Sequence, residues 1–324
     1  MKIHESVRII TSAICPSEVS DMLLEEKLRQ QEHMSPGEKS VADYILTLGK
    51  ELSRYSTRNL ADASYTSPPT VIRLCKKMGY SGFEQLKEQY CKELEYLEQD
   101  FGQVDVNFPF DSSDTLSKAA RKMCRLYEET VKDTLSIMQY DMLLKAVTLI
   151  KYCQTIYVFS AGTTLNLAVA FKEKMMKIGR SVAIPNNLNY QQYEVNCMKK
   201  QDLALIISYS GETGAIVQAA CTCREKGIPV IAITSFGDNT LSRLASCKLL
   251  ISTRESLFYN IGDFSSHISV NFLLDTLYGA YFLQDYEKNY DRKLELVQQM
   301  EKLRHSDNPC LTAQSRKSAS SSHG

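Results

Sequence analysis

Three hydroxyl side chains and a glycine stand at the end of an apolar run that begins at Leu203. They are Ser208, Ser210, Gly211 and Thr213. Neutral hydroxyl donors at this spacing suit a phosphate group, and the glycine lets the backbone approach a ligand closely. A helix beginning at Gly214 would point its free N–H groups and positive dipole end the same way. The same residue types also make ordinary helix caps, so the surroundings of this turn decide its meaning.

Apolar runs alternate with amphipathic helical segments from about residue 151 to residue 252. The predicted strands are residues 155–159, 181–184, 203–208, 229–234 and 248–252. Such alternation predicts a parallel sheet covered by helices on both faces, whose ligands bind at the carboxyl ends of the strands. A second hydroxyl-rich loop, residues 160–164, follows the first strand. Both loops fall at that edge, which favours phosphate binding over a simple cap.

Other ligand classes lack their signatures. Gly162 lacks the rest of G-x-G-x-x-G, and the chain has no G-x-x-x-x-G-K-[ST]. The ten cysteines are scattered, with Cys221 and Cys223 one residue apart and no C-x₂-C pair. We therefore expect reduced thiols, no metal and no cofactor.

This part of the chain resembles the sugar isomerase (SIS) domain. The resemblance rests on a strand followed by Gly162-Thr-Thr164 and a helix, and on a later strand followed by the loop from Ser208 to Thr213. That module binds phosphosugars in isomerases, synthases and regulators. The resemblance implies that the ligand is held by Thr164, Ser208, Ser210, Gly211 and Thr213, with Glu255 and Ser265 from two later segments. Ser160 and Thr164 depart from the usual glycine and serine of the first loop, which predicts a tighter pocket mouth. His267 replaces a frequent arginine and is expected at a polar edge of the pocket or interface.

The amino-terminal part carries a signature of a different kind. Ser35-Pro-Gly-Glu38 combines an N-cap serine, a first-turn proline and a glutamate three residues after the cap. A second short helix is predicted over residues 57–64, and Ser67-Pro68 starts a third that ends at Gly79. Three short helices in this order predict a helix-turn-helix unit.

The third predicted helix has a basic face. Spacings of three and four residues place Thr70, Arg73 and Lys77 on one side of the helix, and Lys76 flanks them. No acidic residue occurs between Asp62 and Glu84. Arginine can reach guanine edges, while lysines and hydroxyls hold phosphates, so this face suits a recognition helix in the major groove. The alternative is a solvated face on a protein-binding unit.

The stretch of residues 35–86 resembles the DNA-binding domain of the RpiR (MurR/RpiR) transcriptional regulators, which join it to a SIS domain in this order. The resemblance covers residues 22–281 and places Ser67, Thr70 and Arg73 in the recognition helix, to which we add Lys76 and Lys77. Tyr65 and Thr66 replace the usual glycine and valine of the turn. Pro69 should restrict Pro68, so we expect the helix to start one residue late.

The expected fold is α/β: an all-α helix-turn-helix domain, then a doubly wound parallel-sheet SIS domain flanked by helices. Its parts are an extension (1–21), the DNA-binding domain (22–98), a linker (99–114), the SIS domain (115–304) and a disordered tail (305–324). Helices over 115–138 and 142–152 should cover the sheet and part of a dimer interface. A helix over 264–283, apolar nearly all round, should be buried on several sides. We expect the linker to transmit little force between the domains.

The favoured function is a DNA-binding transcriptional regulator whose SIS domain senses a phosphorylated sugar. Its expected partners are operator DNA, the sugar phosphate and a second copy in a homodimer or higher oligomer. Lys and Arg together number 38, as do Asp and Glu, so net charge indicates nothing about partners. No secretory or membrane-spanning run is found, and we expect a cytoplasmic protein with no membrane contact.

Two other functions compete with this one. A sugar-phosphate isomerase needs a base near the sugar C1–C2 carbons, and Glu194, Glu212, Glu255 and His267 are the candidates. None sits in a recognised catalytic signature. A protein-binding adaptor would leave the basic helix face unexplained.

Overall fold

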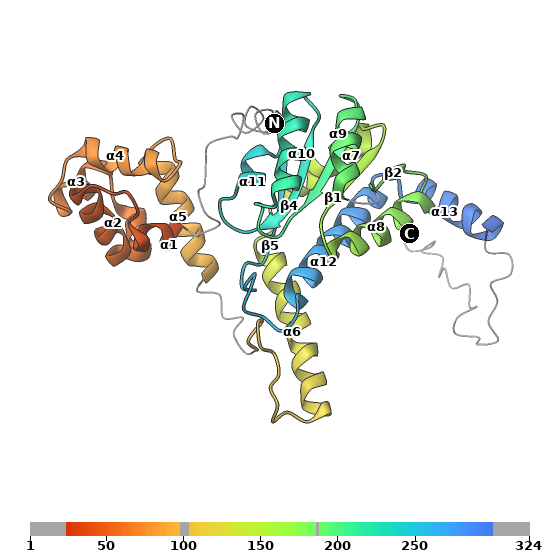
Figure 1. Cartoon of the computed structure of the whole chain (residues 1–324), viewed down its shortest axis with the longest axis horizontal. Coiled ribbons are helices and arrows are strands. Elements are labelled where there is room, and N and C mark those ends of the chain that lie inside the picture. Colours follow the sequence, from red (N-terminus) through yellow and green to blue (C-terminus); the bar gives the residue numbers. More distant parts are fainter. Residues whose placement is uncertain (1–23, 98–103, 186–187, 301–324) are drawn as a thin grey trace, which may run out of the picture.

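The computed structural model describes residues 24–97, 104–185 and 188–300. The predicted extension and tail lie outside these residues. The described chain forms an amino-terminal group of helices and a larger part in which helices surround a sheet (Figure 1). The expected fold class is confirmed.

The amino-terminal helices are α1 (Leu24–Gln30), α2 (Pro36–Leu48), α3 (Thr57–Ala63), α4 (Pro68–Lys77) and α5 (Phe83–Leu97), with a 3₁₀ turn at Gly49–Arg54. Ser35 and Glu38 form the predicted capping box at the start of α2. The helices share one core, in which Ile45, Leu60 and Leu74 are fully buried. The predicted α2, α3 and α4 are confirmed, and α1 and α5 complete the core around them.

Helix α4 starts earlier than its two prolines led us to expect. Ser67 is the extended N-cap residue, and Pro68 is already helical. First-turn amides have no acceptor within a helix, so prolines at these positions lose no hydrogen bond there. The expected one-residue delay is therefore wrong.

Within the described residues, five parallel strands form one sheet in the order β2-β1-β3-β4-β5. They are β1 (Ile156–Ser160), β2 (Val182–Ala183), β3 (Leu203–Ile207), β4 (Val230–Ser235) and β5 (Cys247–Ile251). The chain runs outward from β1 to β2 and then returns to β3 on the other side of β1. The strand order thus reverses between β1 and β3, where open α/β sheets bind ligands.

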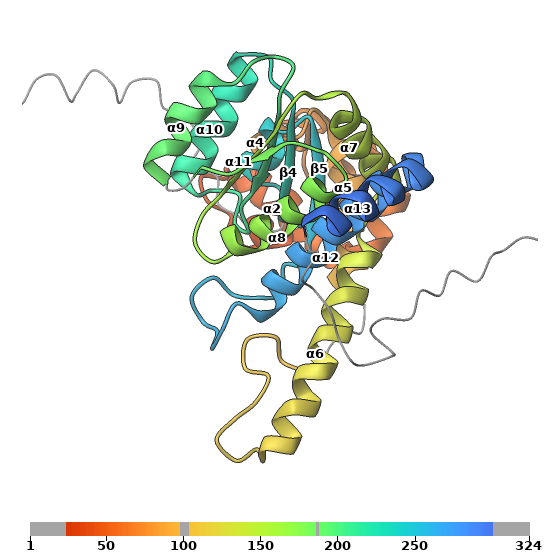
Figure 2. The ribbon, with the colours of Figure 1, turned by 90° about the vertical axis from the view of Figure 1, so that its right-hand side faces the viewer.

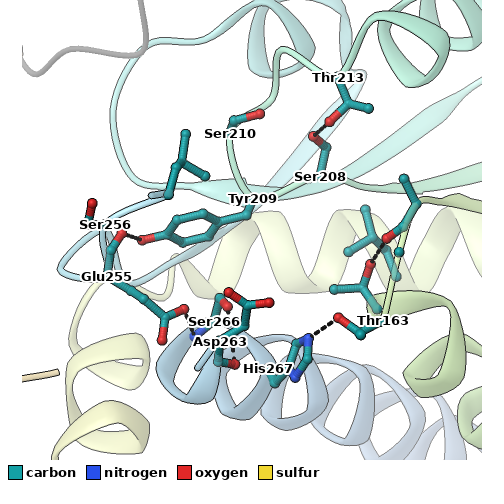
Figure 3. Close-up of a pocket in the computed structure, with 15 residues that line it drawn as sticks. Thr163, Ser208, Tyr209, Ser210, Thr213, Glu255, Ser256, Asp263, Ser266 and His267 are labelled. Atoms are coloured by element: carbon teal, nitrogen blue, oxygen red, sulfur yellow. Dashed lines mark hydrogen bonds between the residues drawn. The ribbon is translucent and has the colours of Figure 1, made fainter. Parts of the chain in front are cut away.

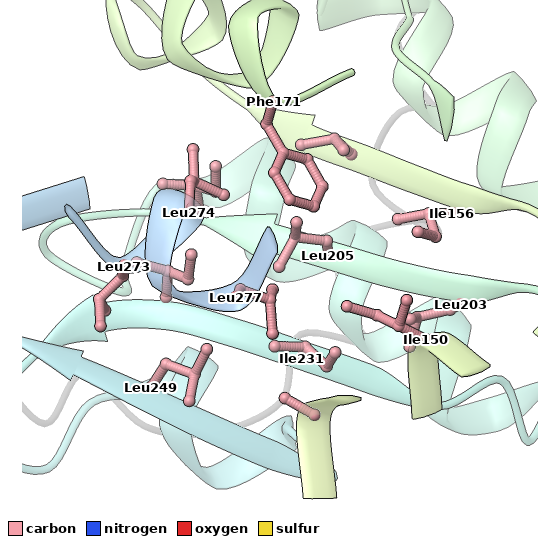
Figure 4. Packing of buried hydrophobic residues seen from close by; sticks show 14 of the residues in the cluster. Ile150, Ile156, Phe171, Leu203, Leu205, Ile231, Leu249, Leu273, Leu274 and Leu277 are labelled. Atoms are coloured by element: carbon pink, nitrogen blue, oxygen red, sulfur yellow. The ribbon is translucent and has the colours of Figure 1, made fainter. Parts of the chain in front are cut away.

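Helices cover both faces of this sheet. One face carries α7 (Tyr140–Tyr152), α8 (Thr164–Lys177) and α12 (Phe264–Phe282), and the other α9 (Leu188–Cys197), α10 (Gly214–Glu225) and α11 (Thr240–Leu244). Side chains of β3 alternate between the two cores. Leu203 and Leu205 belong to the core that includes Phe171 and Leu277 (Figure 4), whereas Ala204 and Ile206 belong to the core on the side of α10. Burial on both faces explains why the strands read as continuous apolar runs.

Helix α6 (Leu116–Ser136) does not cover the sheet as expected. It packs along α12 through buried hydroxyls, with Thr130 donating to Ser265 at 3.2 Å and Thr134 donating to Ser269 at 2.9 Å. The amino-terminal part of α6 extends away from the sheet (Figures 1 and 2). Helix α12 also contacts α7, α8 and β5, so its predicted burial on several sides is confirmed.

The carboxyl end of the described chain is helical. A 3₁₀ turn at Leu283–Asp285 leads into α13 (Tyr286–Met300), which contacts α8 and has no fully buried residue. In the described part of the chain, no helix is long and apolar enough to cross a membrane.

Residues 104–110 of the predicted linker lie against the loop that follows β5. The Asn107 side chain accepts from the Ser256 N–H at 2.7 Å, and its carbonyl accepts from the Ile261 N–H at 3.0 Å. Val104 is buried, and the ring of Phe110 contacts that of Phe264. Residues 104–110 of the predicted linker are therefore fixed to the larger domain, and the expectation that the linker transmits little force stays a prediction.

Glu38 generates a prediction about stability. Its buried carboxylate accepts from the Ser35 N–H at 2.8 Å and pairs with Lys77 Nζ at 2.6 Å. The hydrogen bonds from Lys77 and Ser35 lower the pKa of the Glu38 carboxyl. Glu38→Gln should reduce the free energy of unfolding by about 1–3 kcal/mol near neutral pH, as measured by urea denaturation.

The pH dependence of this effect follows from the lowered pKa. The stabilisation is present above the carboxyl's unfolded-state pKa and is lost as pH falls through the lower folded-state pKa, so the difference between the proteins should shrink in acid. Glu51→Gln is the control, since its ion pair with Arg54 is exposed, and it should change stability by less than about 0.5 kcal/mol. A similar loss in both variants would contradict this assignment.

Candidate functional site

A cavity of about 300 Å³ lies at the carboxyl ends of β1 and β3. Its walls are residues 161–164, 207–210 with Thr213, 255–257, 263, 266 and 267 (Figure 3). The two hydroxyl-rich loops predicted from the sequence therefore meet, joined by a loop that comes from beyond β5.

The loop after β3 holds its hydroxyls in a fixed arrangement. Ser208 Oγ lies 3.1 Å from Thr213 Oγ1 and accepts from the Gly211 N–H at 3.2 Å. Ser210 Oγ accepts from the Glu212 N–H at 3.1 Å, which leaves its O–H proton for another acceptor. Thr213 is the N-cap of α10, but its side chain does not cap the helix. The hydroxyls and the start of α10 thus line the same cavity.

The loop after β1 forms the opposite wall. Thr164 Oγ1 lies 2.5 Å from Ser160 Oγ and donates to the Ala161 carbonyl at 2.8 Å. Thr163 Oγ1 lies 2.6 Å from His267 Nε2, which links the start of α8 to α12. Among the described residues that line the cavity, none is Lys or Arg. An anion bound here would be stabilised by hydroxyls and by the amino-terminal ends of α8 and α10.

Gly211 shapes the loop from behind the cavity. Its φ is 73°, and a Cβ at this position would lie 2.1 Å from Asn239 Oδ1. The Gly211 carbonyl also accepts from the Leu241 N–H at 3.1 Å. A glycine is therefore required both by the left-handed backbone and by the close approach of α11.

Glu255 borders the cavity, but its carboxylate serves α12. One oxygen accepts from the Ser265 N–H at 2.8 Å and the other from the Ser266 N–H at 2.9 Å. The carboxylate thus satisfies two amides that have no acceptor within the helix. Tyr209 fixes the same loop by donating its O–H to the Glu255 carbonyl at 2.7 Å.

The structure does not bring Ser265 into the cavity. Its side chain is buried and accepts the hydrogen bond from Thr130 of α6, so it points away from the ligand side. Ser266 lines the cavity instead, because successive residues on a helix point in different directions. The predicted segment at the start of α12 does reach the cavity, but Ser266 and not Ser265 lies on the face of the helix that lines it.

The candidate catalytic bases separate in the structure. Glu212 Oε1 accepts from the Thr240 N–H at 2.7 Å and caps α11, and Glu194 does not line the cavity. Within the described lining, Asp263 and His267 are the remaining carboxylate and imidazole. Sequence reasoning missed Thr163, Tyr209, Ser256, Asp263 and Ser266 as lining residues, and their closeness to predicted site residues is the signal that could have found them.

The recognition face of α4 is organised around Thr70. Ser67 Oγ lies 3.0 Å from Thr70 Oγ1, which in turn accepts from Arg73 Nη2 at 3.1 Å. Thr70 is buried, whereas Arg73 and Lys76 are exposed. Thr70 therefore orients Arg73 rather than presenting its own hydroxyl to solvent.

Lys77, the last residue of α4, has a 34% exposed side chain that is held by contacts within the domain. Its ammonium group pairs with Glu38 and donates to the His33 carbonyl at 2.7 Å. The DNA contact expected of Lys77 stays a prediction, and its ammonium group is already engaged by Glu38 and the His33 carbonyl. This pair ties the end of α4 to the start of α2.

The comparisons with known proteins agree with both parts of the chain. Residues 22–96 match the helix-turn-helix domain of the rpiR family, and residues 149–277 match the SIS domain. The chain belongs to the RpiR family of transcriptional regulators. Within that family it is a DNA-binding regulator with a phosphosugar-binding SIS domain.

Several solved structures are similar to parts or most of this chain. The Vibrio vulnificus NanR protein complexed with ManNAc-6P has a TM-score of 0.56 and 21% sequence identity, over 87% of this chain and 99% of NanR. The sugar isomerase domain of the RpiR transcription factor from Sphaerobacter thermophilus has a TM-score of 0.49 and 16% identity, over 55% of this chain and 97% of that one. The phosphoheptose isomerase GmhA from Neisseria gonorrhoeae has a TM-score of 0.45 and 13% identity, over 52% of this chain and 98% of that enzyme.

Proposed function

We propose that this RpiR-family regulator binds a phosphorylated sugar in the cavity between β1 and β3, and that binding changes its affinity for operator DNA. The observation that carries the proposal is the convergence of Thr164, Ser208, Ser210 and Thr213 with the starts of α8 and α10. Hydroxyls and helix amino-terminal ends recognise a phosphate. NanR, a structural relative that matches most of this chain, was solved in complex with ManNAc-6P.

The DNA contact is proposed for the exposed face of α4. Arg73, oriented by Thr70, is the candidate for reading a guanine, and Lys76 is the candidate for a phosphate contact. Ser67 at the start of the helix completes this face. We revise the role of Lys77 to holding α4 in the domain.

A symmetric dimer would present two such helices to an inverted repeat, one helical turn or a multiple of it apart, about 34 Å or its multiples. Exposed apolar side chains on α6 support contact between copies, among them Leu116, Tyr127 and Leu135. These side chains lie on a helix that extends from the sheet (Figure 2).

Two sets of contacts support coupling between the cavity and the DNA-binding domain. Asn107 of the connecting segment is bonded to the loop that carries Glu255, as described above. Asp238, which precedes the N-cap of α11, pairs with Arg243 at 2.8 Å and lies 3.8 Å from Lys27 of α1. A ligand that moves either loop would therefore act on the position of the DNA-binding domain.

We further propose that the protein is a sensor and not an isomerase. Glu212 and Glu255 cap helices, so their carboxylate oxygens already accept hydrogen bonds. Asp263 and His267 are the lining groups that could move a proton. An isomerase would therefore have to rely on these two groups as its acid and base.

The DNA assignment predicts different effects for three basic residues. Arg73→Ala should weaken binding to a selected operator by roughly 1–3 kcal/mol, measured at fixed salt. Lys76→Ala should weaken binding to all sequences and reduce the salt dependence by about one phosphate contact. Lys77→Ala should chiefly lower the stability of the domain. Equal operator affinity of the wild type and Arg73→Ala would refute the recognition role.

The sensor assignment predicts that Ser210→Ala weakens binding of the effective sugar phosphate by roughly 1–3 kcal/mol, because a donor to a charged group is lost. Basal DNA binding should be retained. Calorimetric titration of candidate sugar phosphates, with and without operator, should show a coupling of about 1–3 kcal/mol. Ser265→Ala, adjacent in sequence to the cavity but pointing away from it, is the matched control. Unchanged sugar affinity in the presence of operator would leave the SIS domain as a scaffold only.

The third expectation concerns catalysis. Purified protein should not interconvert pentose or hexose phosphates when assayed for aldose–ketose exchange. Turnover above about 1 s⁻¹, within the ordinary range for enzymes, that is lost in Asp263→Asn or His267→Ala would establish the isomerase instead.

A further inference from the structure

Tyr65 has an unusual position in the turn between α3 and α4. Its side chain is 98% exposed, and its backbone φ is 53°. A bulky residue in the left-handed region is strained, and large aromatic side chains are normally at least partly buried. Both features therefore need an explanation.

The backbone of the turn explains the φ value. Helix α3 ends with Ser64 as its C-cap, and Tyr65 is the next residue. The Tyr65 N–H donates to the Asp62 carbonyl at 3.2 Å and the Thr66 N–H donates to the Ala61 carbonyl at 2.8 Å. This pair of bonds is the Schellman motif, whose left-handed position favours glycine. Tyr65 occupies that position, and its exposed ring gains no packing that would offset the strain.

The surroundings of Tyr65 point to its partner. The turn leads directly into α4, whose amino-terminal residues would meet the edges of bases in the major groove. The helix opens with Pro68 and Pro69, which have no backbone N–H, so its first two positions offer no amide to a DNA phosphate. A phenolic O–H next to this helix end supplies a donor where the backbone has none.

We propose that Tyr65 is a DNA-backbone contact, in which its O–H donates a hydrogen bond to a phosphate at the edge of the groove that α4 enters. The strain at φ 53° is retained because glycine, the unstrained residue, cannot make this contact. The inference rests on the proposed mode of DNA binding and extends it to the turn. Since phosphates are present in every sequence, Tyr65 should add affinity without specificity.

The test compares the full-length wild type with Tyr65→Gly and Tyr65→Phe. Tyr65→Gly should raise the midpoint of thermal unfolding by roughly 2–4 °C, because strain is relieved, and yet should bind DNA about tenfold more weakly. Tyr65→Phe should leave the midpoint unchanged and lose most of the same affinity. Both losses should be equal on a selected operator and on a scrambled duplex of equal length, measured by fluorescence anisotropy.

His33→Gly is the matched control, because His33 is also exposed and has a φ of 56° in the same domain. It should gain stability and keep its DNA affinity. A DNA loss in His33→Gly equal to that in Tyr65→Gly would overturn the proposal, since relaxation of the turn would then explain both.

Other results would also overturn it. Wild-type affinity in Tyr65→Phe would exclude the phosphate contact, and a change in sedimentation alone would place Tyr65 between two copies of the chain. The proposed function is tested separately by Arg73→Ala on the same duplexes. If Arg73→Ala loses operator affinity while both Tyr65 variants bind like the wild type, only the role of Tyr65 fails.

Discussion

The convergence of helix amino-terminal ends at one edge of a parallel sheet is the constraint on which the rest of the structure depends. Because β1 and β3 are adjacent and parallel, the helices that follow them, α8 and α10, both begin at the carboxyl edge. The start of α12 is brought to the same place from beyond β5. Three positive dipole ends and their unpaired amides must then be satisfied within a small volume. The Glu255 carboxylate satisfies α12, and the cavity is left between α8 and α10.

The same constraint explains how the site can be connected to the rest of the chain. A loop that turns sharply at Gly211 lies against α11, where Asn239 occupies the space that a Cβ would fill. Glu212 caps α11 through the Thr240 N–H, and the residue just before the N-cap is Asp238, the partner of Lys27. The turn that holds the hydroxyls is thus separated from the DNA-binding domain by one short helix end. Rigid packing of this kind passes on small displacements rather than absorbing them.

Local patterns predict those features that depend on neighbours in sequence. The meeting of the two loops follows from βαβ alternation, and the α2 capping box follows from the spacing of Ser35 and Glu38. The direction in which a side chain points is harder to predict from the sequence, even where the segment that carries it is placed correctly. The resemblance points to Ser265 where Ser266 lines the cavity, since one residue of offset on a helix changes the face. The spacing of basic residues predicts a DNA contact for Lys77 but does not reveal its ion pair with Glu38, which is 39 residues away in the chain. Long-range ion pairs of this kind leave no periodic signal.

The two proposed binding surfaces use charge in opposite ways, and this follows from what each must do. An operator site gains from exposed cations, since each phosphate contact releases counterions and adds affinity on any sequence. A sensor must also release its ligand when the ligand's concentration falls, and a buried ion pair with a phosphate would oppose release. Hydroxyls and helix ends, with no Lys or Arg among the described lining residues, bind the anion without a fixed countercharge. Occupancy of the cavity can then follow the concentration of the sugar phosphate. The size of the response is limited by the difference between the sugar-phosphate affinities of the DNA-bound and DNA-free protein.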